Sequence, residues 1–458
     1  MKSKKETISR RVFGKAGVGS VVVAPMIVAS SILGRAKSRA VGQPPGQSIG
    51  QTGPQPVGRP EVVAPSDRII LGGIGLRSRG MQDLRATLPD PRVKFVAIAD
   101  IRQSALEAVK SAVDQHYGNN DCVLYHDAGE LLAREDIEAV IIATSDRWHA
   151  CMAIWAAQSG KDIFCEKPAA ISIAESFALA ENVRRYGVIY QAGCQRRNVP
   201  NFELAVGLAR SGILGKLHTV HADDWGRTVT PLGHSWWPEE RPEPDPQVLN
   251  WDGWLGPCPW RPYNARYPDG GRSQFWDFHA GILEWASHTG DLCQWAADCD
   301  HTQAITYEPK PGTSHVYCAY SNGVKLVFRG DGWLDLGTCR VRFEGSEGWI
   351  ETGDTGKMEM SANLRKYYQP VNMRGTDPIR HIQDWLDCIR SRSQPRANAE
   401  STCNAHVTSH CAYIACQLGR KVAWDPAKRE FIKDEEANRM RSRAYREPWR
   451  LEALATSM

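Results

Sequence analysis

The sequence predicts an α/β fold with a doubly wound parallel sheet in its N-terminal half. Three apolar strand candidates predict it: one ends in a glycine-rich turn at residues 73–80, a second ends at Asp100, and a third covers residues 137–144. Helical stretches separate these candidates, and alternation of strands and helices is typical of a parallel sheet. The run at 137–144 is apolar throughout, as expected of a strand that is covered on both faces.

The turn GIGLRSRG contains Gly73, Gly75 and Gly80 and leads into a helical stretch. Glycines let a backbone turn tightly and approach a pyrophosphate, which then binds at the helix N-terminus. Ser78 stands where the third glycine of GxGxxG would fall, so the fingerprint is imperfect. Asp100 follows Gly80 by about 20 residues, the distance at which an acid reaches the adenosine ribose in a Rossmann domain.

This carboxylate favours NAD over NADP, because it accepts hydrogen bonds from ribose hydroxyls and repels a 2′-phosphate. Arg102 is close to Asp100 in sequence and would weaken that preference.

Two short motifs follow later strand candidates: TSDRWH at Thr144–His149 and CEKPAA at Cys165–Ala170. Ligands of open parallel sheets bind at the carboxyl ends of the strands, so both motifs are expected beside the cofactor. A lysine beside apolar surface can have a lowered pKa and act as a base, which makes Lys167 the first catalytic candidate. The alternative interpretation of Lys167 is a solvated surface lysine that follows a strand.

The charge distribution separates a basic leader from a mildly acidic body. The chain carries a net charge of +4, yet its first 40 residues hold most of the excess of Lys and Arg. A mildly acidic body does not suggest nucleic-acid binding. Arg10 and Arg11 precede an apolar stretch at 16–34, as in a signal peptide, and SRRVFGK resembles the twin-arginine export consensus.

We therefore expect residues 1–40 to engage the twin-arginine export machinery and to direct the protein to the periplasm. Cleavage after Ala40 and retention as a membrane anchor both remain open. Residues 41–66 are rich in Gly, Pro and Gln, as in a flexible linker.

Cysteine and tryptophan are both distributed unevenly. The 13 cysteines include no CxxC pair, and Cys403, His406, His410 and Cys411 could bind a metal or belong to a packed helix. Zinc sites usually show tighter paired spacing, so we expect no metal. Many of the 16 tryptophans fall between residues 225 and 295, where they either stack on sugar faces or pack a core.

The glycine turn, Asp100, TSDRWH, GKDIFCEKP and QAGCQRR together resemble the glucose–fructose oxidoreductase, inositol dehydrogenase and rhizopine catabolism (Gfo/Idh/MocA) family. The later strings LNWDGWLGPCPWRPYNARY and HIQDWLDCIRSRSQPRANAE resemble its subgroup with twin-arginine leaders. The resemblance implies a Rossmann domain at 67–190 and a C-terminal α/β domain at 191–458 with an open, mostly antiparallel sheet. That sheet commonly joins subunits in the family, so a homo-oligomer is expected.

Carried over position by position, the resemblance assigns three groups of residues. The cofactor-binding candidates are Gly73, Gly75, Arg79, Gly80, Asp100, Arg102, Thr144, Ser145, Trp148, His149, Glu166 and Lys167. The catalytic candidates are Lys167, Glu284 and His288, and the substrate-binding candidates are Arg196, Arg197 and Asp291.

Some of these positions depart from the family pattern. Glu284 replaces the Asp of the family's Asp-x-x-x-His motif, and Asp291, one turn beyond His288, is an alternative source of the carboxylate. On a helix, Glu284 and His288 would face the same way, so the carboxylate could orient the imidazole. His279 is an extra imidazole near the expected site.

The resemblance implies an NAD-dependent oxidoreductase that acts on a CH–OH group of a sugar or cyclitol. One alternative is a glycoside hydrolase or lyase that uses NAD transiently, but such relatives lose the EKP string that Glu166, Lys167 and Pro168 retain. The other alternative is a non-catalytic dinucleotide-binding protein, and the retention of Lys167 and His288 argues against it. Because NAD is made in the cytoplasm, an exported enzyme is expected to hold its cofactor through a closed redox cycle.

Overall fold

The computed structural model describes residues 64–224, 239–268, 275–367 and 378–449 of the 458-residue chain. All of these residues belong to one compact unit, Arg59–Met458. The expected leader and most of the expected linker lie outside the described residues. Within the described part, no helix is long and apolar enough to cross a membrane.

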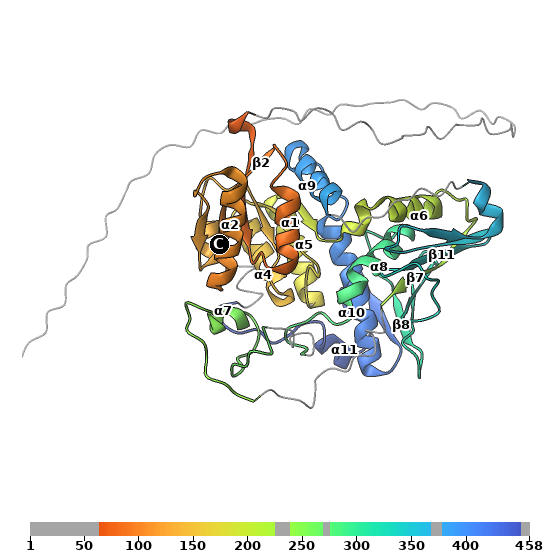
Figure 1. Ribbon diagram of the computed structural model, residues 1–458. Helices are drawn as coiled ribbons and strands as arrows, with labels where there is room; N and C mark the ends of the chain where they lie inside the picture. Colours follow the sequence, from red (N-terminus) through yellow and green to blue (C-terminus); the bar gives the residue numbers. More distant parts are fainter. Residues whose placement is uncertain (1–63, 225–238, 269–274, 368–377, 450–458) are drawn as a thin grey trace, which may run out of the picture. The chain divides into compact units, whose positions relative to one another are not determined.

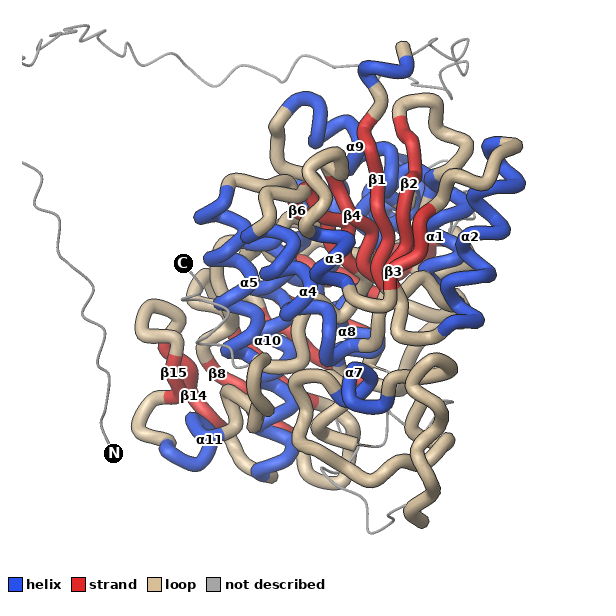
Figure 2. The backbone as a smooth tube through the Cα atoms, turned by 90° about the vertical axis from the view of Figure 1, so that its left-hand side faces the viewer, coloured by secondary structure: helices blue, strands red, loops and turns tan. Residues whose placement is uncertain are grey.

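Six parallel strands form the first sheet, in the order β3-β2-β1-β4-β5-β6. Figure 1 shows this sheet in the part of the molecule that bears the label β2, and Figure 2 labels β1, β2, β3, β4 and β6. Strand order reverses between β1 and β4, which makes this the point where ligands bind in doubly wound sheets. The predicted Rossmann sheet is thereby confirmed. Its strands are β1 (Ile69–Ile74), β2 (Val93–Ala99), β3 (Val123–Tyr125), β4 (Ala139–Ile142), β5 (Asp162–Cys165) and β6 (Tyr190–Ala192).

Helices cover both faces of this sheet and bury two separate apolar clusters. One face packs against α1 (Ser78–Thr87), α2 (Gln103–Tyr117) and α9 (Ile379–Ser391). The other packs against α3 (Ala128–Leu132), α4 (Asp146–Gln158) and α5 (Ile173–Tyr186). The helix α9 comes from the far end of the chain, and its buried Trp385 lies edge-on to Phe164 of β5.

Nine strands form the second sheet, in the order β13-β12-β11-β7-β10-β9-β8-β14-β15. The β7–β10 pair is parallel, and the other pairings are antiparallel, as expected from the resemblance. The strands are β7 (Leu217–Asp223), β8 (Thr306–Pro309), β9 (Val316–Ala319), β10 (Lys325–Arg329), β11 (Val341–Gly345), β12 (Gly348–Thr352), β13 (Met358–Met360), β14 (Val422–Asp425) and β15 (Glu430–Phe431).

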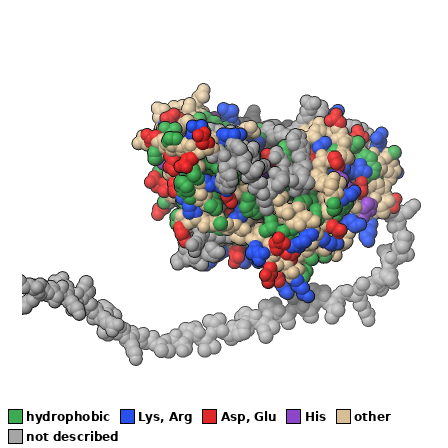
Figure 3. Space-filling view, turned by 90° about the horizontal axis from the view of Figure 1, so that it is seen from below, with side chains coloured by type: hydrophobic (Ala, Val, Ile, Leu, Met, Phe, Trp, Pro, Cys, Tyr) green, Lys and Arg blue, Asp and Glu red, His purple; other side chains and the backbone are tan. Residues whose placement is uncertain are grey.

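Three helices cover one face of the second sheet: α6 (Pro200–Arg210), α8 (Leu283–Ala296) and α10 (Ala399–Leu418). The short helices α7 (Trp251–Leu255) and α11 (Glu435–Arg439) complete the α-helices of the described part. Asn398 caps α10 by accepting the N–H of Ser401, and Gly419 ends it in the left-handed conformation. Acidic and basic side chains are interspersed over the face in Figure 3.

All thirteen cysteines are free thiols, and all but Cys416 are buried. Burial disfavours the thiolate and raises the pKa of Cys258, Cys339 and Cys403 to about 12.

Candidate active site

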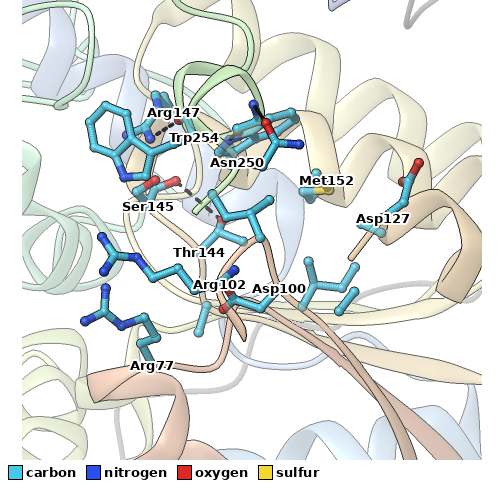
Figure 4. A pocket seen from close by; sticks show the side chains of 18 of the residues that line it. Arg77, Asp100, Arg102, Asp127, Thr144, Ser145, Arg147, Met152, Asn250 and Trp254 are labelled. Carbon is cyan, nitrogen blue, oxygen red and sulfur yellow. Dashed lines mark hydrogen bonds between the residues drawn. The ribbon is translucent and has the colours of Figure 1, made fainter. Parts of the chain in front are cut away.

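A cavity of about 800 Å³ opens at the carboxyl ends of β1, β2, β3 and β4. Figure 4 shows it from close by, with Asp100, Arg102, Thr144 and Ser145 on its wall. The predicted cofactor residues on this wall are Gly75, Arg79, Asp100, Arg102, Thr144, Ser145 and Trp148. Sheet order puts β5 and its Lys167 on the other side of β4, so this cavity covers the half of a dinucleotide site that lies next to Asp100.

Two glycines permit the close approach of α1 to β4. Gly75 has a φ of +72°, and a Cβ there would lie 2.9 Å from the backbone Cα of Thr144. A Cβ on Gly80 would lie 2.9 Å from the Cβ of Ala143. Both positions therefore need glycine, which fits a turn that brings the backbone against a pyrophosphate.

Asp100 follows β2, and its Oδ1 accepts the backbone N–H of Arg102 at 2.9 Å. Burial raises the pKa of Asp100 to about 6, although that N–H and the charges of Arg77 and Arg102 lower it. The side chain is therefore mostly ionised at neutral pH. Arg77, which sequence analysis missed although it lies within the glycine turn, lines the cavity near this acid (Figure 4).

Other cavity residues come from segments far along the chain. Asn250 and Trp254 of the α7 region, and Trp449 near the C-terminus, line the wall together with Arg147 of α4. No local spacing links residue 250 or 449 to the turn at 73–80, so the sequence alone indicates no role for these residues.

His149 does not line the described cavity. The imidazole is buried, with Nδ1 2.7 Å from the carbonyl oxygen of Pro168 and Nε2 3.3 Å from that of Thr144. It thus joins the segment after β4 to the segment after β5, which is a positioning role. In the segment after β5, the backbone N–H of Ala169 donates to Nε2 of His406 at 3.1 Å.

Glu166 lies at the centre of a buried polar cluster. It accepts hydrogen bonds from Arg79 Nε at 3.0 Å, from Gln195 Nε2 at 2.7 Å and from the backbone N–H of Lys167 at 3.0 Å. Arg79 also pairs with Asp83 at 3.0 Å. Burial, followed by the charge of the neighbouring Glu166, raises the pKa of Asp83 to about 9, so Asp83 is protonated at neutral pH.

Lys167 reaches from the Rossmann sheet to α8. Its Nζ donates to the backbone carbonyl oxygen of Glu284 at 2.9 Å. Arg79 lines the cavity and binds Glu166, so the Glu166 side chain connects the cavity wall to the segment that carries Lys167.

The expected pairing of Glu284 with His288 is wrong. Glu284 Oε2 lies 3.8 Å from Nε2 of His279, which in turn lies 3.7 Å from Asp146 Oδ2. Helix periodicity places Glu284 and His288 on one face, but the residues just before α8 bring His279 to the carboxylate instead.

His288 is held by Arg196, which donates from Nη1 to Nε2 at 3.0 Å. Arg196 is fixed in turn by two hydrogen bonds to Asp354, at 3.2 and 2.9 Å. Burial, followed by the charges of Arg196 and Lys167, lowers the pKa of His288 well below its usual value. Since an arginine can only donate, the neutral ring carries its proton on Nδ1, which is buried and has no hydrogen-bond partner among the described residues. His288 therefore offers a donor and no free lone pair.

Arg197 and Asp291 do not match the expected substrate-binding role. Arg197 is 2% exposed and binds both oxygens of Asp291, at 2.6 and 2.8 Å, and both oxygens of Asp300, at 2.8 Å. Burial raises the pKa of Asp291 to about 6 against the opposing charge of Arg197. These charges are satisfied by one another, so they hold α8 to the segment after β6.

Two family models match the chain. The model described as "Oxidoreductase family, NAD-binding Rossmann fold" matches residues 69–194, and "Oxidoreductase family, C-terminal alpha/beta domain" matches residues 210–451. The chain belongs to the Gfo/Idh/MocA oxidoreductase family. It therefore has the NAD(P)-binding domain of that family, at the place where the cavity lies.

Curated relatives match about a third of the chain. They include an uncharacterized oxidoreductase YrbE of Bacillus subtilis, 33% identical over 153 residues, and the rhizopine catabolism protein MocA of Rhizobium meliloti, 30% identical over 159 residues. A glycosyl hydrolase family 109 protein of Shewanella baltica is 34% identical over 168 residues. These matches cover 33%, 34% and 34% of this chain and 43%, 47% and 35% of the relatives, so the chain matches less than half of each relative's length.

Solved structures share the fold over nearly their whole length. An aldose-aldose oxidoreductase of Caulobacter crescentus superimposes with a TM-score of 0.55 at 15% identity, covering 78% of this chain and 99% of that one. A myo-inositol 2-dehydrogenase of Lactobacillus plantarum superimposes with a TM-score of 0.53 at 17% identity, with the same coverage.

Proposed function

We propose that the protein transfers hydride between a bound NAD and the carbinol carbon of a sugar or cyclitol. The observation that carries this proposal is the position of Lys167, which is joined to the dinucleotide cavity by Glu166 and Arg79 and reaches α8 at Glu284. The glycine turn and the cavity fit a dinucleotide in size and in backbone approach.

A nicotinamide, when bound, supplies or accepts the hydride. Lys167 then accepts the hydroxyl proton when the substrate is oxidised and returns it to the carbonyl oxygen when the substrate is reduced. Nδ1 of His288 donates a hydrogen bond to the same oxygen and holds it, without taking the proton. The sequence predicted that Glu284 orients His288, but the hydrogen bond that orients the imidazole comes from Arg196.

For the cofactor we propose NAD, on the charge of Asp100, with Arg77 and Arg102 close enough to reduce the discrimination against NADP. We also propose that the cofactor is loaded before twin-arginine export to the periplasm and is then held, so that one sugar is oxidised and a second is reduced. The structural relative named an aldose-aldose oxidoreductase is consistent with such a closed cycle.

We further propose that the protein is a homo-oligomer joined through the face of the second sheet that lies opposite to α6, α8 and α10.

A second candidate is redox-neutral cleavage of a glycoside, because curated relatives include glycosyl hydrolase family 109 proteins at up to 34% identity. Transient oxidation of the sugar would precede loss of the leaving group. The same Lys167 would serve that reaction, so only product analysis separates the two candidates.

The test uses protein purified from the exported fraction, dialysed extensively, and assayed for bound dinucleotide by mass spectrometry. Incubation with pairs of sugars, one as aldose and one as carbonyl acceptor, should give matched oxidised and reduced products without net NADH. Release of a glycosidic leaving group would favour the second candidate. A protein that is empty after dialysis and consumes added NAD in stoichiometric amounts would contradict the closed cycle.

A further inference from the structure

The outer wall of the dinucleotide cavity is built from two segments remote from the Rossmann fold. Asn250, Asp252, Gly253 and Trp254 of the first segment line it, and Pro448 and Trp449 of the second do so as well. We refer to residues 249–256 and 446–449 together as the clasp.

The first segment of the clasp is fastened to α4. Trp148 Nε1 donates to the carbonyl oxygen of Gly253 at 3.0 Å, and Arg147 Nε donates to that of Trp254 at 2.9 Å. The guanidinium of Arg147 also stacks over the Trp254 ring, 3.7 Å from its centroid. Gly256 packs so closely on Trp148 that a Cβ there would lie 2.2 Å from the indole.

The second segment is fastened to the first by Arg446. Its backbone N–H donates to the carbonyl oxygen of Pro257 at 2.9 Å, and its guanidinium donates to the carbonyl oxygens of Asp252 at 2.9 Å and Gly256 at 3.0 Å. Arg446 also pairs with the Asp252 carboxylate. Trp449, whose N–H donates to the carbonyl oxygen of Arg446, lies edge-on to Trp148 with ring centroids 5.7 Å apart.

These contacts bring aromatic side chains together on one part of the cavity wall, which we call the aromatic chamber. Trp148, Met152 and Trp155 of α4 form one part of its lining, and Trp449 lies against Trp148. In a dinucleotide whose ribose lies at Asp100 and whose pyrophosphate lies at the glycine turn, the purine lies beyond the ribose, away from Lys167. A purine is a flat aromatic group, and indole rings bind such groups by stacking or edge contact.

We propose that this chamber is the purine-binding subsite of the dinucleotide, and that the clasp holds the cofactor by its adenine end. The proposal rests on the proposed function, since it requires a dinucleotide in the cavity. It adds a physical cause for retention: the adenine leaves only when Trp449 swings away from Trp148 and the Arg446 contacts to the first segment break.

The experiment loads the full-length protein with NAD labelled in the adenine ring and follows its release during a chase with unlabelled NAD. Trp449→Ala should raise the release rate about 10-fold or more, since one aromatic contact to a base changes affinity by roughly 5- to 150-fold. Trp260→Ala is the matched control, because Trp260 is 56% exposed, close to the first segment, and absent from the cavity wall. It should release NAD at the wild-type rate.

Trp449→Phe keeps an aromatic ring and should restore most of the retention, which separates loss of the contact from general damage to the fold. Titration with adenosine monophosphate and with nicotinamide mononucleotide locates the effect: Trp449→Ala should weaken binding of the first and leave the second unchanged. Unaltered release and unaltered adenosine monophosphate binding in Trp449→Ala would overturn the purine subsite while leaving the proposed function intact. Failure of the wild type to bind NAD or NADP would overturn both.

Discussion

The replacement of Lys167 by methionine tests the catalytic assignment, and Lys161 provides an internal control. The two lysines flank β5, one before Asp162 and one after Cys165. Each donates from Nζ to one backbone carbonyl oxygen, Lys161 to Arg134 at 2.7 Å and Lys167 to Glu284 at 2.9 Å. Methionine keeps the apolar stem of either side chain and removes the charge and the donor.

Loss of one such charged hydrogen bond should lower the free energy of unfolding by about 1.5–3 kcal/mol at most, and by similar amounts in both variants. The turnover rate should distinguish Lys167→Met from Lys161→Met. Removal of a general acid–base group lowers turnover by roughly 10² to 10⁴, and a factor of 10² corresponds to about 2.7 kcal/mol of activation free energy. Only Lys167→Met should show this loss, because Lys161 lies at the opposite end of the strand.

The assay is single-turnover hydride transfer in protein already loaded with cofactor, followed at the absorbance of NADH, with unfolding by urea measured in parallel. Bound dinucleotide should be unchanged in both variants, which isolates the chemical step from binding. Turnover of Lys167→Met within threefold of Lys161→Met would refute the assignment. Near-normal turnover in Lys167→Met together with abolition in His288→Ala would show that the roles are reversed.

Three further predictions concern charge. Asp100→Ala should reduce the preference for NAD over NADP in binding titrations, and a wild-type protein that binds NADP as tightly as NAD would contradict the premise. Arg197→Met should destabilise the protein by about 3–5 kcal/mol in urea unfolding because it leaves Asp291 buried and unpaired, whereas Arg210→Met, at the exposed pair with Asp298, should change stability by about 1 kcal/mol or less. Asp83, with its pKa raised to about 9, binds a proton more tightly in the folded state, so wild-type stability falls as pH rises from about 4 to 9. Asp83→Asn lacks this titration and should gain stability relative to the wild type between pH 5 and pH 8, and a relative loss over that interval would argue against a protonated Asp83.

The sequence predicted the parts of the site that are contiguous in the chain. The glycine turn and Asp100 belong to one strand–helix–strand unit, so their spacing alone brought them to the same edge of the sheet. The apolar run at 137–144 likewise predicted β4, the strand that pairs with β1 at the switch point.

The side-chain partners that come from distant segments of the chain could not be predicted from the sequence. The spacing of Glu284 and His288 on α8 predicted their common face but not the partner of either side chain, since His279 and Arg196 approach from outside the helix. Arg197 carried no local sign that Asp291 and Asp300 would enclose it. Trp449 has no residue nearby in sequence that would indicate the cavity.

In the tryptophan-rich region, the structure shows the packing interpretation for Trp251 and Trp254. Trp251 stacks on Trp254 with centroids 4.8 Å apart, inside a cluster that also includes Tyr267 and Phe278, which is packing. Trp254 also lines the cavity, and stacking of a tryptophan on a sugar stays a prediction.

The buried thiols have a consequence for the compartment in which this protein is proposed to work. Disulfide exchange requires a thiolate that another sulfur can reach, and burial here removes both the ionised form and the access. The folded protein would thus pass through an oxidising environment with its cysteines reduced, whereas an unfolded chain would expose thirteen reactive sulfurs to mispairing. Folding before export would therefore protect the covalent integrity of the chain as well as its cofactor.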